Sequence, residues 1–346
     1  MMVSADYRLS LNYARRVPVA VIGGGDRCVD LILPCLRYLP LDLVALADAD
    51  RRRGMQVAKM FGAQRFYPDA ETLLEREEVR AAIFSLPALA DGALPYPAVA
   101  STALAAGVHA WVDAPAASTA TEITKQYTDG AIRGRSYVMG GYRRPFMPGY
   151  NALKTALGEA GVRPDAYGLW CALPALPALP TAIDQAGDLP ALLMHPLALL
   201  VDLFGEAKSV EWSWHADRRG ISVTLGYPTG LVGTLQLICT RAGTPSMEAL
   251  RVHAGDAVWQ VSQGLEMARL DAPTTGAAGP GAIHAGPAEG GASALAATGY
   301  LGSLLHFAEA VLAERPVARL NVLHLLQMMT VQDALRSGRE RQWVSL

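Results

Sequence analysis

The stretch that decides the fold is Val17-Pro-Val-Ala-Val-Ile-Gly-Gly-Gly-Asp-Arg-Cys28. Its first half, residues 17–22, is a short apolar and largely β-branched run, which predicts a buried strand. Three glycines follow directly, and apolar side chains then recur at helical spacing as far as Leu36. A strand that turns through glycines into a helix is typical of the first βα unit of a doubly wound sheet.

The same alternation of apolar strands and helices continues to about residue 140. Helices are expected at about 50–61, at about 69–76 and before residue 108. Further strands are expected at 41–47, 79–85, 108–112 and 135–139, and the short run Arg65-Phe-Tyr67 lies between the first two helices. Strands that alternate with helices form βαβ units and a parallel sheet with both faces covered. The sequence therefore predicts an α/β fold, with a doubly wound Rossmann domain at residues 1–141.

The pattern changes after residue 142, where strand-like segments follow one another. They lie at 167–172, 210–215, 221–227, 231–240 and 250–261. Tyr227-Pro-Thr-Gly230 reads as the turn between two of them, a connection usual in antiparallel sheets. We therefore expect residues 142–346 to form an α+β domain with an open, mainly antiparallel sheet.

The end of the chain adds an insertion and two helices to this second domain. Residues 271–299 are rich in Gly, Ala and Pro without periodicity, which predicts a mobile surface insertion. Two helices are expected at about 301–313 and 321–336, and the last could pack back on the first domain.

Composition excludes several classes of protein. Of 346 residues, 51% are hydrophobic and 18% charged, which argues against disorder, and the net charge of -2 argues against nucleic-acid binding. The four cysteines have no metal-ligand spacing, so neither a metal site nor a disulfide framework is expected. The longest apolar run, 191–204, is too short to cross a membrane, and residues 1–16 lack the apolar core of a signal peptide. We expect a soluble, cytoplasmic protein.

The glycines match the dinucleotide fingerprint G-x-G-x-x-G/A, with Cys28 at its third small position. Gly23 permits the tight turn, and Gly25 lets the backbone approach a pyrophosphate at the helix N-terminus. Asp48 ends the second strand, roughly 20 residues further on, where an acid would bind the ribose hydroxyls and favour NAD. An arginine of the run 51–53 could instead pair with the phosphate of NADP, although a solvated helical turn explains that run better.

Further motifs appear in an order that resembles the Gfo/Idh/MocA family of NAD(P)-dependent oxidoreductases. These are Ser85-Leu-Pro87, the run 105–115 that ends in Val112-Asp-Ala-Pro115, Gly140-Gly-Tyr-Arg-Arg-Pro-Phe146, and His195 spaced from Gly205. The resemblance covers nearly the whole chain. It implies a small-molecule substrate, an NAD or NADP cofactor contacted by Pro87 and Asp113, and a homo-oligomer formed through the C-terminal sheet.

The catalytic positions depart from that pattern. Sugar and polyol dehydrogenases of the family are understood to use a lysine of Glu-Lys-Pro with an aspartate and a histidine of Asp-x-Gly-x-His-x-x-Asp. Here the lysine position is Ala114, and the helix motif has Ala191, Leu193 and Ala198 in place of its Asp, Gly and Asp. Only His195 of that set is present, so the usual hydroxyl–carbonyl proton relay is missing.

Two residues remain as candidate acids. His195 could be a general acid, since an unperturbed histidine titrates close to neutrality. Pro196 after it means that the helix either kinks or starts there. Tyr142 lies at the handover between the domains, where its phenol could protonate a product. Packing explains either residue as well, and for Tyr142 alone it is the better explanation. Asp202 lies two helical turns from His195, too far to replace the missing carboxylate.

Three functions are compatible with these residues. The first is an oxidoreductase of non-standard chemistry, which reduces an imine, a carbonyl or another polarised double bond. The second is a non-catalytic subunit or regulator that binds a dinucleotide or another ligand. The third is a redox-neutral reaction with retained NAD. The two arginines 143 and 144 could orient an anionic substrate, or form surface ion pairs.

Overall fold

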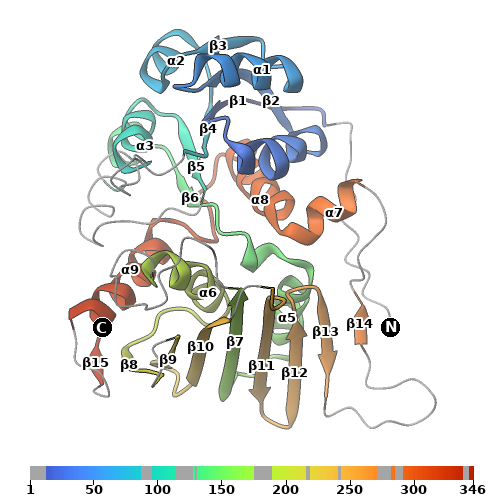
Figure 1. Ribbon diagram of the computed structural model, residues 1–346, viewed down its shortest axis with the longest axis vertical. Helices are drawn as coiled ribbons and strands as arrows, with labels where there is room; N and C mark the ends of the chain where they lie inside the picture. Colours follow the sequence, from blue (N-terminus) through green and yellow to red (C-terminus); the bar gives the residue numbers. More distant parts are fainter. Residues whose placement is uncertain are drawn as a thin grey trace. The chain divides into compact units, whose positions relative to one another are not determined.

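The computed structural model describes residues 13–86, 96–113, 128, 131–174, 189–215, 219–240, 243–270, 282–284, 291–337 and 343–346. These residues form two compact units (Figure 1). The first unit holds the described residues up to Arg143 together with 291–329. The second holds those from Arg144 to 284 together with 330–346. The chain therefore changes unit close to the expected boundary but returns to the first unit before its end.

The first unit is built on a six-stranded parallel sheet in the order β3-β2-β1-β4-β5-β6. The strands are β1 (Val17–Ile22), β2 (Leu41–Ala47), β3 (Arg65–Tyr67), β4 (Ala81–Phe84), β5 (His109–Val112) and β6 (Val138–Gly140). This is the doubly wound order, in which ligands bind beyond the carboxyl ends of the strands where the order reverses. The predicted parallel sheet is confirmed.

Helices cover this sheet and close the unit. They are α1 (Arg51–Phe61), α2 (Ala70–Arg76), α3 (Tyr96–Ala105), α7 (Gly291–Thr298) and α8 (Tyr300–Leu312). The helix expected after the glycines consists of a π-helical turn, η1 (Cys28–Ile32), and a 3₁₀ segment, η2 (Leu33–Tyr38). Pro34 lies at the junction and has no N–H for a regular helical bond.

Helix α8 lies far from the strands of the parallel sheet in the sequence but contacts them in the structure. Helix α8 packs on β1 and β5, and the Trp111 indole N–H donates to the Ser303 hydroxyl at 3.0 Å. Helix α7 packs on η2 and α8. The expectation of a structureless insertion at 271–299 is thus wrong at its end, because packing stabilises a helix that has weak periodicity.

The second unit is built on a nine-stranded sheet in the order β14-β13-β12-β11-β7-β10-β9-β8-β15. Its strands are β7 (Ala166–Pro174), β8 (Ser209–Trp214), β9 (Gly220–Gly226), β10 (Val232–Thr240), β11 (Met247–Ala254), β12 (Ala257–Ser262), β13 (Glu266–Arg269), β14 (Ala282–His284) and β15 (Val344–Ser345). Only β7 and β10 pair in parallel, so the mainly antiparallel prediction is confirmed. The single strand expected at 250–261 is wrong: a tight turn at Gly255, where φ is +57°, divides it.

One face of this sheet is covered and the other is open. The helices of the unit are α5 (Pro148–Ala160), α6 (Leu189–Phe204) and the end of α9 (Val322–Ser337). A 3₁₀ turn, η3 (Arg144–Phe146), packs against both α5 and α6. Along β10 and β11 buried residues alternate with exposed ones, as expected for a half-covered sheet. No helix among the described residues is long and apolar enough to span a membrane.

His109 makes the stability of the first unit depend on pH. Its Nδ1 accepts the Tyr137 backbone N–H at 3.0 Å, so the ring must stay neutral there. Burial, together with the charge of Arg80, lowers the pKa of His109 to about 4. The unfolded chain, whose His titrates near about 6.5, therefore takes up this proton first.

We expect the free energy of unfolding to fall as the pH drops from about 6.5 through about 4, by on the order of 2 kcal/mol after allowance for partial exposure. The difference between wild type and His109→Gln, measured by urea denaturation across this range, isolates the effect. Parallel pH profiles of the two proteins would contradict it.

Candidate active site

The glycine turn joins β1 to the first helix at the carboxyl edge of the parallel sheet. Gly23 has φ +101°, and a Cβ there would overlap the Ser85 carbonyl oxygen, so only glycine fits. A Cβ at Gly25 would meet nothing within 4 Å. The chain is helical from Asp26 onward, so unpaired N–H groups lie next to this open space. The turn therefore has room and donors for a pyrophosphate.

Asp48 lies beside this turn, after β2, and is only 4% exposed. Its Oδ2 accepts the Gly24 N–H at 2.6 Å, and its Oδ1 accepts the Asp50 N–H at 2.8 Å. The carboxylate thereby ties the glycine turn to the start of α1. Because Asp48 is hydrogen-bonded to the glycine turn, its carboxylate would lie close to a ribose bound there.

Arg53 also binds Asp48, which the sequence interpretation missed. Its Nη2 lies 2.7 Å from Oδ1 and its Nε lies 3.2 Å from Oδ2. The solvated-turn interpretation is therefore wrong for Arg53, while Arg51 and Arg52 are exposed. The arginine side chain is 41% exposed, so it can move away when a ribose needs the carboxylate. The residues fit a dinucleotide, provided that Arg53 yields or pairs with a 2′-phosphate.

Asp113 gathers a second polar cluster at the end of β5. Its Oδ2 accepts the Ser85 hydroxyl at 3.3 Å and the Arg27 Nη1 at 3.4 Å, and its Oδ1 accepts the Tyr300 hydroxyl at 3.4 Å. Burial raises the pKa of Asp113, against the opposing charge of Arg27. Ser85 has a local signal, the end of a strand, but Tyr300 lies on α8 and nothing local pointed to it.

Two residues of the predicted site lie outside the described residues. They are Pro87 and Ala114, which follow β4 and β5. Asp113 and the glycine turn, however, belong to the same carboxyl edge of one sheet. No group of three or more potential metal ligands occurs among the residues that the structure describes.

His195 is a half-buried residue inside α6, in the second unit. The helix begins at Leu189 and continues past Pro196, so the alternative in which the helix starts at His195 is wrong. Asp202, one of the few buried carboxylates, is held by Lys154 of α5 at 2.9 Å. Asp202 is therefore already paired with a lysine of another helix.

Tyr142 belongs to the first unit and has no exposed surface. A Cβ at Gly140 would lie 3.2 Å from its ring, which shows how closely the ring covers β6. This enclosure favours the packing interpretation of Tyr142. The neighbouring Arg143 donates to the Thr298 carbonyl oxygen at 3.3 Å within the same unit.

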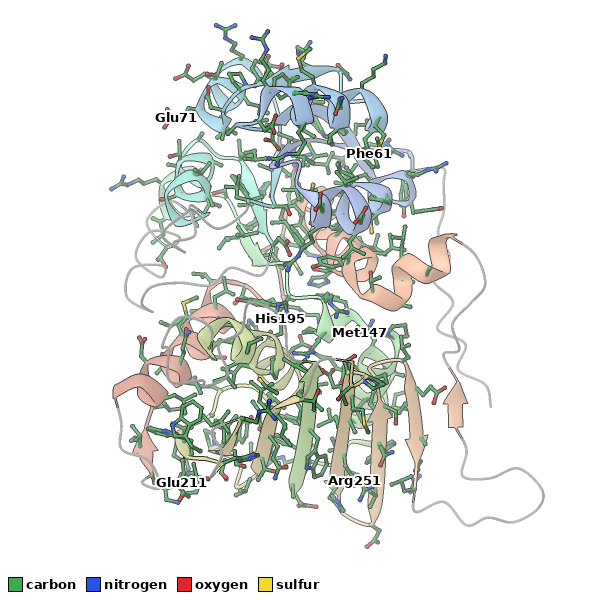
Figure 2. All side chains as sticks on the ribbon, viewed as in Figure 1. Phe61, Glu71, Met147, His195, Glu211 and Arg251 are labelled. Atoms are coloured by element: carbon green, nitrogen blue, oxygen red, sulfur yellow. The ribbon has the colours of Figure 1, made fainter. Side chains whose placement is uncertain are left out.

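Arg144 has a different environment from the surface pair that the sequence suggested. It is 9% exposed and its Nη2 lies 2.6 Å from Oε2 of Glu248, on β11. The surface interpretation is wrong because η3 packs against α5 and α6, and Arg144 is thereby buried against Glu248. Figure 2 shows Met147, just after this turn, at the same end of the unit as His195.

Residues 17–139 match the family described as "Oxidoreductase family, NAD-binding Rossmann fold" (GFO_IDH_MocA). A curated relative, inositol 2-dehydrogenase from Acidothermus cellulolyticus, is 29% identical over 164 residues. That alignment covers 47% of this chain and 46% of the relative, so the matched part spans about half of each.

Solved structures extend the likeness to both units. A dehydrogenase from Chromobacterium violaceum has a TM-score of 0.78 at 19% identity, over 93% of this chain and 95% of that one. Levoglucosan dehydrogenase in complex with NADH and levoglucosan has a TM-score of 0.78 at 15% identity, over 96% and 99%. At these identities the structures show the fold. The match at residues 17–139 identifies that part of the chain as the NAD-binding Rossmann fold of the Gfo/Idh/MocA oxidoreductases.

Proposed function

We propose that the protein is an NAD-dependent oxidoreductase that acts on a small molecule. The observation that carries the proposal is the carboxyl edge of the parallel sheet, where an open glycine turn adjoins the buried Asp48. When bound there, the nicotinamide cofactor would supply or accept a hydride. The chain's own contribution is to hold the pyrophosphate at the turn and the ribose at the carboxylate.

The proposed reaction is reduction of an imine, a carbonyl or another polarised double bond. Ala114 cannot exchange a proton, and Ala191 and Ala198 replace two carboxylates of the family's pattern. His195 is the remaining candidate: it would give a proton to the oxygen or nitrogen of the double bond, while the hydride adds to the carbon. We favour it over Tyr142, whose ring is fully enclosed.

A non-catalytic ligand-binding subunit or regulator is the alternative. One observation favours it: Asp202, the carboxylate on the same helix as His195, is neutralised by Lys154. Among the described residues of α6 no second carboxylate is present to orient the imidazole.

Thermal-shift titration with NAD⁺, NADH, NADP⁺ and NADPH tests cofactor binding, because a ligand of the native state raises its stability with concentration. We expect NADH to stabilise the protein and to be oxidised in the presence of a ketone or imine. His195→Ala should lower the turnover number by about 10²–10⁴-fold without changing the NADH-induced shift. His253→Ala, at an exposed position on β11, is the matched control.

The outcomes separate the candidates. No stabilisation by any dinucleotide would refute the oxidoreductase. Stabilisation without turnover of any ketone or imine would instead support the binding subunit.

We also propose a homo-oligomer formed through the open face of the nine-stranded sheet. Trp170, Val232 and Met247 are 42%, 48% and 65% exposed, and strand register places all three on that face. Large apolar side chains gathered on one face are typical of an interface. The molecular mass in solution, measured by light scattering, decides between this assembly and a monomer.

A further inference from the structure

The second unit contains a full positive charge in its interior. Arg144 is the first of the described residues in this unit, and only 11% of its side chain is exposed. Its Nη2 donates to Glu248 Oε2 at 2.6 Å, and the Glu248 side chain is equally buried. Burial lowers and the Glu248 carboxylate raises the pKa of Arg144, with a net upward shift, so the guanidinium stays charged.

Glu248 is shared among three donors. Besides Arg144, it accepts the Tyr150 hydroxyl at Oε1 over 2.5 Å and the Cys171 thiol at Oε2 over 3.6 Å. Burial raises the pKa of Tyr150 and of Cys171, so both donors are neutral near pH 7. The cluster therefore has one positive and one negative charge and no net charge.

One nitrogen of the Arg144 guanidinium makes no hydrogen bond to the described residues. Arg144 Nη1 is enclosed and has no hydrogen-bond partner among the described residues. Buried N–H groups without an acceptor are rare, and for a charged donor they cost stability because neither water nor protein replaces the lost hydration. Because Nη1 is enclosed, an acceptor reaches it only when the groups around it move, and it then recovers that cost.

Arg144 and His195, the candidate acid, belong to elements that pack against each other. Turn η3, which begins with Arg144, packs against α6, the helix of His195. Met147, whose N–H donates to the Arg144 carbonyl oxygen at 3.0 Å, lies with His195 at one end of the unit, whereas Glu211 and Arg251 lie at the other (Figure 2). The unused N–H and the histidine thus occupy the same end of one unit.

The charge of the cluster decides which acceptor fits. A carboxylate or phosphate at Nη1 would lie close to the Glu248 carboxylate and give the buried cluster a net negative charge. In a medium of low dielectric constant such an excess charge is unfavourable. A neutral oxygen, of a carbonyl, an amide or a hydroxyl group, satisfies Nη1 without that repulsion.

We propose that Arg144 Nη1, with Glu248 as its counter-ion, binds a neutral oxygen acceptor of the substrate and discriminates against anionic ones. The proposal rests on the proposed function for the existence of a substrate. It replaces the interpretation of Arg144 as a residue that orients an anionic substrate, because Glu248 already neutralises the guanidinium.

Acetamide and acetate are suitable probes, since they share size and planar shape and differ in charge. The full ¹⁵N-labelled chain is titrated with each, and the guanidinium NMR signals of Arg144, assigned with Arg144→Lys, report binding. We expect acetamide to bind with a Kd at least about 10-fold lower than that of acetate. Glu248→Gln should strengthen acetate binding by about 10-fold or more and leave acetamide nearly unchanged.

Tyr150→Phe is the matched control, because it removes a hydrogen bond to Glu248 without altering the charge of the cluster. It should keep the preference for acetamide. Equal binding of the two probes to the wild type, or no change of the Arg144 signals with either, would overturn the proposal whether or not Glu248→Gln folds. The titrations are run with and without NADH, so failure of the cofactor to bind counts only against the proposed function.

Discussion

Replacing Asp48 with alanine will weaken NADH binding by about 100-fold or more. The buried carboxylate is the acceptor that the structure holds beside the glycine turn, and a hydrogen bond to a charged acceptor contributes about 1.5–3 kcal/mol. Loss of two such bonds to the ribose corresponds to at least about two decades in Kd. Isothermal titration calorimetry with NADH and NADPH measures the change.

The position of Arg53 predicts how Asp48→Ala changes the affinity for NADPH. Once Asp48 is removed, the guanidinium that it now binds becomes free for a 2′-phosphate, so NADPH should lose much less affinity than NADH. The converse change, Arg53→Ala, leaves Asp48 fully available, so NADH should bind several-fold more tightly. Equal losses of NADH and NADPH affinity in Asp48→Ala would contradict this assignment.

Asp50→Ala is the matched control for this series. Asp50 caps α1 through the Arg53 backbone N–H at 3.0 Å and is exposed, so its loss costs about 1 kcal/mol of stability. Its side chain does not bind the glycine turn. NADH affinity should therefore remain within a few-fold of wild type, and a loss as large as that of Asp48→Ala would show that the effect arises from helix destabilisation.

Substitution of Gly23 by alanine will destabilise the first unit by at least about 3 kcal/mol. Two costs add: φ of +101° is unfavourable for any residue with a Cβ, and that Cβ would overlap the backbone oxygen of Ser85. The oxygen belongs to the chain just after β4, so it cannot move without disturbing the sheet. Urea denaturation followed by circular dichroism measures the loss.

Gly62→Ala separates these two costs. Gly62 ends α1 with φ +75°, but an added Cβ would meet nothing within 4 Å. Only the conformational penalty remains there, which is about 1 kcal/mol. A destabilisation of Gly23→Ala no larger than that of Gly62→Ala would show that the chain relieves the overlap with Ser85 by a small shift.

The alternation of apolar strands and helices that begins with residues 17–22 and the glycines after them predicted the parallel sheet. Periodicity is a local property, because a buried strand and an amphipathic helix each repeat over a few residues. The same reasoning located β7 to β10, but it joined β11 and β12 into one strand. Both are apolar on one face, and the turn at Gly255 that divides them is too short to interrupt the pattern.

The sequence predicted only those parts of the candidate site whose residues lie close together in the chain or at the ends of neighbouring strands. The glycine turn and Asp48 lie at the ends of neighbouring strands, so their spacing along the chain indicated their proximity. The contact between Arg53 and Asp48 is also short in sequence, yet a side-chain rotamer decides it. Pattern reasoning assigned Arg53 to solvent because it reports which face of a helix is apolar and not where a long side chain points.

The sequence by itself thus determined the two architectures, the glycine turn with its acid and the absence of a lysine at position 114. The tertiary structure alone decided that Tyr300 binds Asp113 and that Glu248 neutralises Arg144. These partners are far apart in the chain and share no repeat, so no local pattern connects them. They meet because packing of α8 on the parallel sheet and of η3 against α5 and α6 removes their charges and donors from water, and buried polar groups are then stable only when they pair.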